Sequence, residues 1–245
     1  MALNNTINAT TILNRVAAEV GQQPIPDPLA SQDPAFVKMQ YLLNTAGEEL
    51  MQAYPWELLV RDYSFTTGFN DSGEYALPAD FGYMLNQTNW ERTNRLPMRA
   101  LDSQTWAYLK GRDLGSSTIY ASFRIAEGKY NIYPTPPPEG LEVNFQYITS
   151  NWVWDGNEVN PVYKSEVTMP TDVPLFDRTL ITRALKCKWL ESNGFDSTKA
   201  QADYNQIFAF LTGHDTAAPV LNMGRRGRQI PMISGDNVPI TGFGI

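Results

Sequence analysis

Two patterns of apolar and polar positions divide this chain: helical spacing near both ends and alternation in the middle. The first predicted helix has one apolar face at spacings of three and four residues, formed by Ile12, Leu13, Val16, Ala17 and Val20. Gly21 is expected to end it, since glycine favours the backbone that follows a helix. The second helix is expected to begin at Asp33 and Pro34, a side-chain cap followed by a residue that needs no amide partner, and to end at Pro55.

Two more helices are predicted after the middle section. Asp172 and Pro174 are expected to open the third, and Gly194 to end it. Asp196 or Ser197 is expected to cap the fourth, which runs to Gly213. Because the link between these two helices is only a few residues long, they are expected to pack antiparallel. Their apolar faces are formed by Phe176, Leu180, Ala184, Cys187 and Leu190, and by Ala200, Tyr204, Ile207, Phe208 and Leu211.

The section from Trp56 to about Pro170 favours strands, because its apolar and polar positions alternate among many aromatic and branched residues. Its clearest feature is a predicted hairpin over residues 130–147. The turn of that hairpin is expected from Pro134 to Gly140, since proline blocks a strand and glycine allows the chain to reverse. One helix is expected inside this section, from Asp102 to Lys110.

These elements predict an α+β fold with three parts. About four helices from both ends of the body form a helical bundle, the central section is a β-rich insert, and the chain ends in an extended carboxy-terminal arm. The helices outside the insert are expected to pack together, because each has an apolar face and no other partner of matching shape. The predicted divisions are 1–55 and 171–213 for the bundle, 56–170 for the insert and 214–245 for the arm.

The arm has no apolar stripe, helical or alternating, that is long enough to bury a face of its own. Three prolines and five glycines separate its apolar residues. A chain end of this composition takes a fixed shape only against another molecule, so we expect it to dock on a partner. The residues expected to make this contact are Val220, Leu221, Arg225, Arg226, Arg228, Ile230, Met232, Ile233, Val238, Ile240, Phe243 and Ile245.

The formal net charge is −7, of which the arm carries +1 and the body −8. An acidic body argues against tight wrapping by DNA and against binding to an anionic membrane, because both need dense positive charge. The single cysteine, Cys187, excludes an internal disulfide, so the expected site of folding is a reducing cell interior. The first residues lack the basic and apolar regions of a signal peptide, and no apolar run is long enough to span a bilayer.

No set of residues predicts catalysis, a metal site or a cofactor. His214 is the only histidine, and a catalytic base needs a nucleophile and an orienting acid beside it. One histidine and Cys187 cannot supply the three or four ligands of a zinc site. Glu48 and Glu49 point in different directions from one helix, although acids elsewhere could still converge in space. The glycines form neither a phosphate loop nor a dinucleotide motif.

The aromatic residues of the predicted insert allow two interpretations. They form a β core and a subunit interface, or they form a platform on which sugar rings stack. The stretch from Asn151 to Asp155 is where such a platform would lie. The rings concerned are Trp90, Trp106, Trp152, Trp154, Tyr120, Tyr130, Tyr133 and Tyr147.

Three strings of this sequence resemble the head-to-tail adaptor (connector) proteins of tailed bacteriophages, which in short-tailed phages are also called tail tubular protein A-like or head-completion proteins. The opening TTILNRVAAEVGQQPI resembles their first helix and turn. AYPWELLVRDYSF, followed by YALPADFGYM, resembles the passage from their second helix into the β insert. IYPTPPPEGLEVNFQYI resembles a hairpin seen in many of them, and the resemblance covers about residues 10 to 213.

The resemblance implies a structural virion protein in the neck or tail, made in the host cytoplasm and without enzymatic activity. Such adaptors form a ring, usually of twelve copies, below the portal through which DNA enters and leaves the capsid, and their arms dock on the portal. The implied partners are the portal protein, a tail or nozzle protein, other copies of the chain, and DNA that passes through the channel without specific binding. Membrane binding is not implied.

Two other functions remain open, because a fold does not determine a role. One is a carbohydrate-binding or cell-wall-degrading virion protein, and the other is a different neck or tail-hub component. In the adaptor interpretation, Arg225, Arg226 and Arg228 would meet acids on the portal or phosphates of passing DNA.

Overall fold

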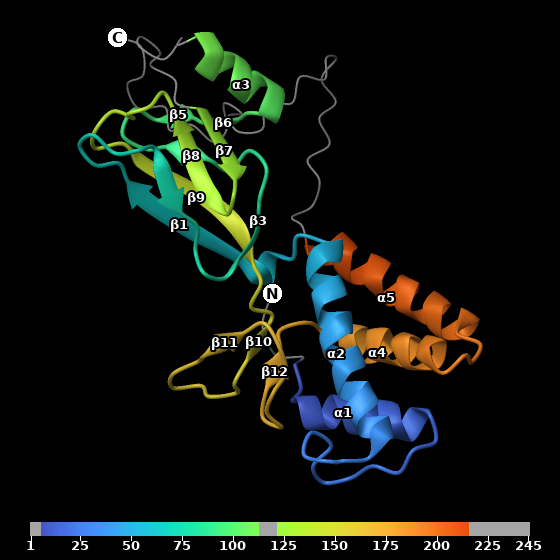
Figure 1. The fold of residues 1–245 in the computed structure, drawn as a ribbon. Coiled ribbons are helices and arrows are strands. Elements are labelled where there is room, and N and C mark those ends of the chain that lie inside the picture. The colour runs from blue at the N-terminus through green and yellow to red at the C-terminus, as the bar shows by residue number, and fades with distance from the viewer. Residues whose placement is uncertain (1–5, 113–121, 216–245) are drawn as a thin grey trace, which may run out of the picture. The chain divides into compact units, whose positions relative to one another are not determined.

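The computed structural model describes residues 6–112 and 122–215, which form five α-helices and three β-sheets (Figure 1). This confirms the prediction of a mixed α+β fold. The arrangement of the helices as one bundle with a β insert stays a prediction, as do the divisions inside the described chain. The helices are α1 (Ala9–Glu19), α2 (Pro34–Ala53), α3 (Ser103–Arg112), α4 (Arg178–Ser192) and α5 (Thr198–Asp215).

The first two helices begin and end where local sequence signals place them. In α1, Gly21 follows the last turn with a φ of +79°, a conformation that favours glycine. At the start of α2, the Asp33 side chain accepts a hydrogen bond from the Ala35 amide at 2.9 Å, and Pro34 is the first helical residue. The predicted apolar face of α1 is buried, except that Val20 is only partly buried. On α2, residues at spacings of three and four are buried as well: Phe36, Met39, Leu43, Ala46 and Leu50.

The predicted start of the third helix is wrong. Helix α4 begins at Arg178, after Asp177, whose side chain accepts a hydrogen bond from the Thr179 amide at 2.8 Å. Asp172 lies six residues earlier, and its carboxylate forms an ion pair with Lys164 instead of capping α4, while Pro174 is in a strand. The predicted end is correct, because Gly194 follows α4 with a φ of +73°.

The predicted end of the fourth helix is also wrong. Asp196 accepts a hydrogen bond from the Thr198 amide at 2.9 Å, as expected of a cap. Helix α5 then continues through Gly213 to Asp215, because the exposed Gly213 has open space around it and the helix tolerates a glycine there. His214 therefore belongs to this helix, and the arm begins at least two residues later than predicted.

Twelve strands form the three sheets of the described chain. The first sheet has the order β1-β9-β4-β5, with β3 also paired to β9; the second has the order β2-β8-β7-β6, and the third β11-β10-β12. The strand bounds are β1 (Val60–Thr66), β2 (Glu74–Ala76), β3 (Phe81–Met84), β4 (Trp90–Glu91), β5 (Leu96–Pro97), β6 (Arg99–Ala100), β7 (Ser122–Ala126), β8 (Lys129–Tyr133), β9 (Glu142–Thr149), β10 (Val153–Trp154), β11 (Tyr163–Lys164) and β12 (Val173–Pro174).

The predicted hairpin over residues 130–147 is wrong in its pairing, although both of its strands exist. Strand β8 pairs with β7 through a tight turn at Glu127 and Gly128, both with positive φ. Strand β9 pairs with β1, where Tyr63 faces Phe145. The connection between β8 and β9 is long enough to carry the chain from one sheet to the other, and alternation identifies a strand without identifying its partner.

Aromatic rings form the core between the first two sheets. The Phe123 and Tyr130 rings stack with centroids 5.0 Å apart, and Tyr130 and Phe145 stack at 5.5 Å, so three strands contribute to one column. The Tyr130 hydroxyl contacts the amide of buried Asn89, and burial raises the pKa of that hydroxyl. This β core joins residues of both sheets: Met98, Phe123, Tyr130, Ile132, Val143, Phe145 and Tyr147.

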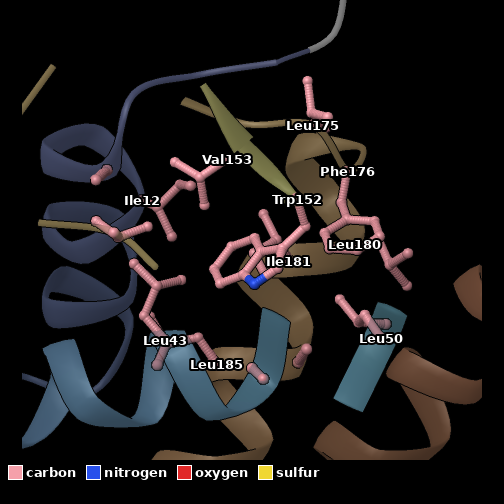
Figure 2. Close-up of a cluster of buried hydrophobic side chains, with 14 of the residues drawn as sticks. Ile12, Leu43, Leu50, Trp152, Val153, Leu175, Phe176, Leu180, Ile181 and Leu185 are labelled. Carbon is pink, nitrogen blue, oxygen red and sulfur yellow. The ribbon is translucent and has the colours of Figure 1, made fainter. Parts of the chain in front are cut away.

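Trp152 lies at the centre of the second core, among apolar side chains of α1, α2 and α4 (Figure 2). Gly47 in the middle of α2 makes room for it, because a Cβ at Gly47 would lie 2.3 Å from the indole ring. A glycine inside a helix costs about 1 kcal/mol relative to alanine. The fit of the tryptophan therefore explains a glycine that helix propensity disfavours.

Strand β9 and the residues after it contribute to both cores. Phe145 and Tyr147 are in the β core, whereas Ile148, Trp152 and Val153 are in the helical core. The described residues through Asp215 form one compact unit. The third sheet follows β9 in the chain and packs against the helices through Val153 of β10.

Candidate interaction surface

The segment from Asp155 to Asp172, between β10 and β12, displays large apolar side chains to solvent. The exposed fractions are 84% for Val159, 56% for Val162 and 57% for Met169. Single exposed apolar residues are normal on a protein, but three large ones within one segment single it out as a candidate for an interaction. The segment is therefore the strongest candidate for a functional surface in the part of the chain that the structure describes.

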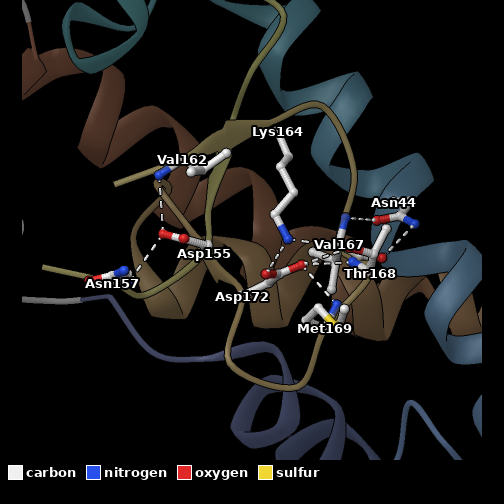
Figure 3. Close-up of polar contacts among 9 residues, drawn as sticks. All are labelled: Asn44, Asp155, Asn157, Val162, Lys164, Val167, Thr168, Met169 and Asp172. Carbon is white, nitrogen blue, oxygen red and sulfur yellow. Dashed lines mark hydrogen bonds and ion pairs between the residues drawn. The ribbon is translucent and has the colours of Figure 1, made fainter. Parts of the chain in front are cut away.

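The first part of this segment is held by Asp155 (Figure 3). Its carboxylate accepts hydrogen bonds from the amides of Asn157 at 3.1 Å and Val162 at 3.2 Å, which closes the loop before β11. Gly156 has a φ of +77°, and a Cβ there would lie 2.7 Å from the carbonyl oxygen of Thr171. Both the backbone conformation and the close approach require glycine at this position.

The second part is held by Asp172, whose side chain is fully buried. One carboxylate oxygen lies 2.6 Å from Lys164 Nζ, and the other accepts hydrogen bonds from the Thr168 and Met169 amides, both at 2.8 Å (Figure 3). Burial alone raises the pKa of this carboxyl, but the hydrogen bonds outweigh burial and hold the pKa below its usual value. Asp172 is therefore charged at neutral pH and fixes the backbone at Thr168 and Met169.

The segment is also tied to two helices. The Asn44 side chain of α2 accepts a hydrogen bond from the Val167 amide at 2.9 Å and donates one to the Val167 carbonyl at 3.4 Å. At the start of α1, the Ala9 amide donates to the Asp172 carbonyl oxygen at 2.7 Å. A segment fixed in this way loses little conformational entropy when a partner binds, which favours association.

Helix α2 meets the segment at Asn44, and the same side of the helix carries exposed residues. Tyr41 is 71% exposed and lies one turn before Asn44, which binds the segment. Three glutamates are also exposed, one on α2 and two in the segment. The acidic loop surface, as we name it, comprises Tyr41, Glu48, Glu158, Val159, Val162, Glu166 and Met169.

The arm residues predicted to contact a partner, from Val220 to Ile245, all lie outside the described residues, and their role stays a prediction. His214 is exposed on α5, and its ring packs edge-on against Phe210 with centroids 4.5 Å apart. Cys187 is buried, and burial together with the nearby Glu191 carboxylate raises the pKa of its thiol. A buried thiol of raised pKa is a poor nucleophile.

Glu48 and Glu49, the adjacent acidic residues considered as a catalytic pair, do not form a catalytic site with other acids among the described residues. Glu48 and Glu49 are both exposed, and Glu49 forms an ion pair with Lys188 at 2.6 Å. Within residues 6–112 and 122–215, no cluster of histidine, cysteine, aspartate and glutamate could hold a metal ion. No helix in the same ranges is both long and apolar enough to cross a membrane.

Most aromatic residues considered for sugar binding are buried. Trp152 and Tyr130 have no exposed surface, so the stretch from Asn151 to Asp155 does not present a flat ring to solvent at its centre. Trp90 and Trp154 are partly buried, and Tyr120 lies outside the described residues. This favours the interpretation of these rings as a core. The remaining rings, also buried, are Trp106, Tyr133 and Tyr147.

Sequence reasoning missed the acidic loop surface almost entirely. It assigned Asp172 to a helix start, because an aspartate before proline resembles a cap, and it did not single out Lys164. A signal was present in Asp155, Gly156 and Asn157, three turn-forming residues followed by Val159 and Val162 without strand alternation. The burial of Asp172 depends on Asn44 and α1, more than a hundred residues away, and no local pattern reveals it.

Comparison with known proteins agrees with the resemblance seen in the three sequence strings. A search of curated proteins finds no match. The family model described as SU10 adaptor protein matches residues 7–228, which include both cores and all of the acidic loop surface. Such a protein is a structural component of the virion and interacts with other phage structural proteins. The chain therefore belongs to the SU10 adaptor protein family, the structural head-to-tail adaptors of bacteriophages.

Proposed function

We propose that this protein is a ring-forming subunit that joins the portal to the tail and forms part of the channel through which the genome is ejected. The family match over residues 7–228 is the observation that carries this proposal. The ring is expected to contain twelve copies, and the narrower relation to tail tubular protein A-like proteins is part of the same proposal. The acidic body supports it as well, because a wall of negative charge lets DNA slide without binding.

The segment after Asp215 is proposed to dock on the portal. Its isolated apolar residues suit pockets along an extended groove, and Arg225, Arg226 and Arg228 suit acidic groups on the partner. Ordering such a segment costs entropy, so a stable joint needs many copies acting together. In this proposal the helices stand around the channel, and the β region from Trp56 to Pro170 lies towards the outside or towards the next tail component.

We propose a mechanical role without catalysis. The described residues offer a buried cysteine, an exposed histidine beside a phenylalanine, and ion-paired acids, none of which forms a nucleophile with a base. The alternative of carbohydrate binding needs exposed rings, and Trp152 and Tyr130 are buried. A different neck or tail-hub role would share the family and differ in its partners.

Truncation after Asp215 tests the portal contact. The body is expected to fold as before, since both cores lie before this point, and to lose its attachment to portal rings. Co-sedimentation of full-length and truncated protein with purified portal measures the attachment, and circular dichroism checks folding. A folded truncated protein that still sediments with portal would remove the arm from the account.

A further inference from the structure

Cations from α4 lie between carboxylates of α1 and α5 on one side of the helical region. Glu19 of α1 lies 2.7 Å from Lys186 Nζ and 3.6 Å from the Arg183 guanidinium. Asp203 of α5 lies 4.0 Å from the same guanidinium. Lys186 and Arg183 are partly exposed, so this network is at the surface and can be reached by a partner.

Two further cations extend this network. Arg15 precedes Glu19 by four residues on α1, and Lys199 precedes Asp203 by four residues on α5, so each lies on the same side of its helix. Both are exposed, and neither forms an ion pair with any described residue. Four cations therefore stand beside the two carboxylates of the network, Glu19 and Asp203. The basic helix surface, as we name it, comprises Arg15, Arg183, Lys186 and Lys199.

The basic helix surface and the acidic loop surface face different sides of the chain. On α4, Lys186 and Lys188 are about 200° apart around the helix; Lys186 reaches Glu19, whereas Lys188 reaches Glu49 of α2. On α2, Glu49 and Asn44 are about 140° apart, and Asn44 binds the Val167 backbone. Helices α2 and α4 therefore lie between the two surfaces.

The acidic loop surface has the opposite charge and carries apolar side chains as well. Glu48, Glu158 and Glu166 are exposed, and none of them forms an ion pair among the described residues. The cation within the segment, Lys164, is already neutralised by buried Asp172. A partner that covers this surface must bury Val159, Val162 and Met169 and bring positive charge.

From this complementarity we infer that the acidic loop surface of one copy binds the basic helix surface of a second copy of the chain. The inference rests on the proposed function, because it names the contact that builds the ring. Two different, complementary surfaces on one chain join copies in a single direction, and such contacts close into a ring when the rotation between copies allows. Charge sets the register and speeds encounter, while burial of the apolar side chains slows dissociation.

Charge reversal tests the contact. In one variant Glu158 and Glu166 are replaced by lysine, and in a second Arg15 and Lys199 are replaced by glutamate. In each variant the two surfaces that meet between copies carry charge of the same sign. Self-association should therefore weaken at least about tenfold. A mixture of the two variants pairs opposite charges at every contact and should restore association, as should all four changes in one chain.

Analytical ultracentrifugation of the full-length protein at low salt measures association. The matched control replaces Glu127 and Glu139, exposed acids of the β region, by lysine, and should associate like wild type. The inference is overturned if wild type stays monomeric, if the reversed variants associate like the control, or if the mixture does not restore association. Portal co-sedimentation of wild type is scored separately, and its absence would count against the proposed function itself.

Discussion

The helical core and the β core of this protein achieve close packing in different ways. In the helical core one large ring, Trp152, packs directly against the α2 backbone at Gly47, where no side chain intervenes. The stability of this core therefore depends on the close fit of these two residues. In the β core three rings from three strands stack in a column, with Tyr130 in the middle. The difference teaches that the helical core has little tolerance for change at its centre, whereas the β core distributes its contacts.

The largest effect is expected at Trp152. Replacement by alanine should lower the free energy of unfolding by about 3 to 5 kcal/mol, because it empties a fully buried ring site. Gly47→Ala alone should cost about 1 to 3 kcal/mol, since its Cβ would overlap the indole. In the Trp152→Ala background the same change should cost nothing or be stabilising, because the overlap is gone and alanine favours the helix.

Urea unfolding of wild type, both single variants and the double variant gives this double-mutant cycle. Val37→Ala, on the exposed side of α2, is a control for general effects of changing that helix. If the effects of the two changes on the free energy of unfolding are additive, the glycine at position 47 is not required by the Trp152 ring.

Each region also has buried polar contacts, among them the Asp172–Lys164 pair near the helices and the Tyr130–Asn89 contact in the β core. Asp172→Asn should lower the free energy of unfolding by about 2 to 4 kcal/mol at neutral pH, less than a wholly buried pair because Lys164 can reach water. The pKa of Asp172 is lowered in the folded state, so its contribution is present above the usual aspartate pKa of about 4 and is lost as pH falls through the lowered value.

The difference between wild type and Asp172→Asn should therefore shrink as the pH is lowered below about 4. Thermal unfolding across this range measures it, and Asp155→Asn serves as a comparison within the same segment. A difference that stays constant with pH would mean that the charge of Asp172 does not hold the segment.

The smallest effect is expected at Tyr130. Tyr130→Phe keeps the ring stack and removes the hydroxyl that contacts Asn89, so the cost should be about 1 to 2 kcal/mol for the buried amide left without this partner. Urea unfolding measures it. A loss as large as that of Trp152→Ala would show that the β core depends on one point as much as the helical core does.

The same comparison explains what could be predicted from the sequence. Helix α2 was predicted from Asp33 to its end because its cap, its first proline and its apolar spacing are all local. The partners of β8 and β9 were not, because Tyr130 and Phe145 meet through two sheets whose pairing depends on strands far apart in the chain. Alternation identified both strands and left their partners undetermined.

The candidate surface shows the same limit. The exposure of Val159 and the burial of Asp172 depend on how residues 155–172 pack against α1 and α2. Asp172 and Asp177 both stand shortly before an apolar run, but Asp172 binds Lys164 and the Thr168 and Met169 amides, whereas Asp177 caps α4. The composition of residues 216–245 predicts a docking arm, and these residues lie outside the described ones.

Electron microscopy of the full-length protein mixed with purified portal tests the central claim most directly. The account predicts a closed ring of this chain at the narrow end of the portal, absent when residues 216–245 are removed. Portal particles that remain bare in the presence of excess folded protein, or that carry single copies without a ring, would contradict it.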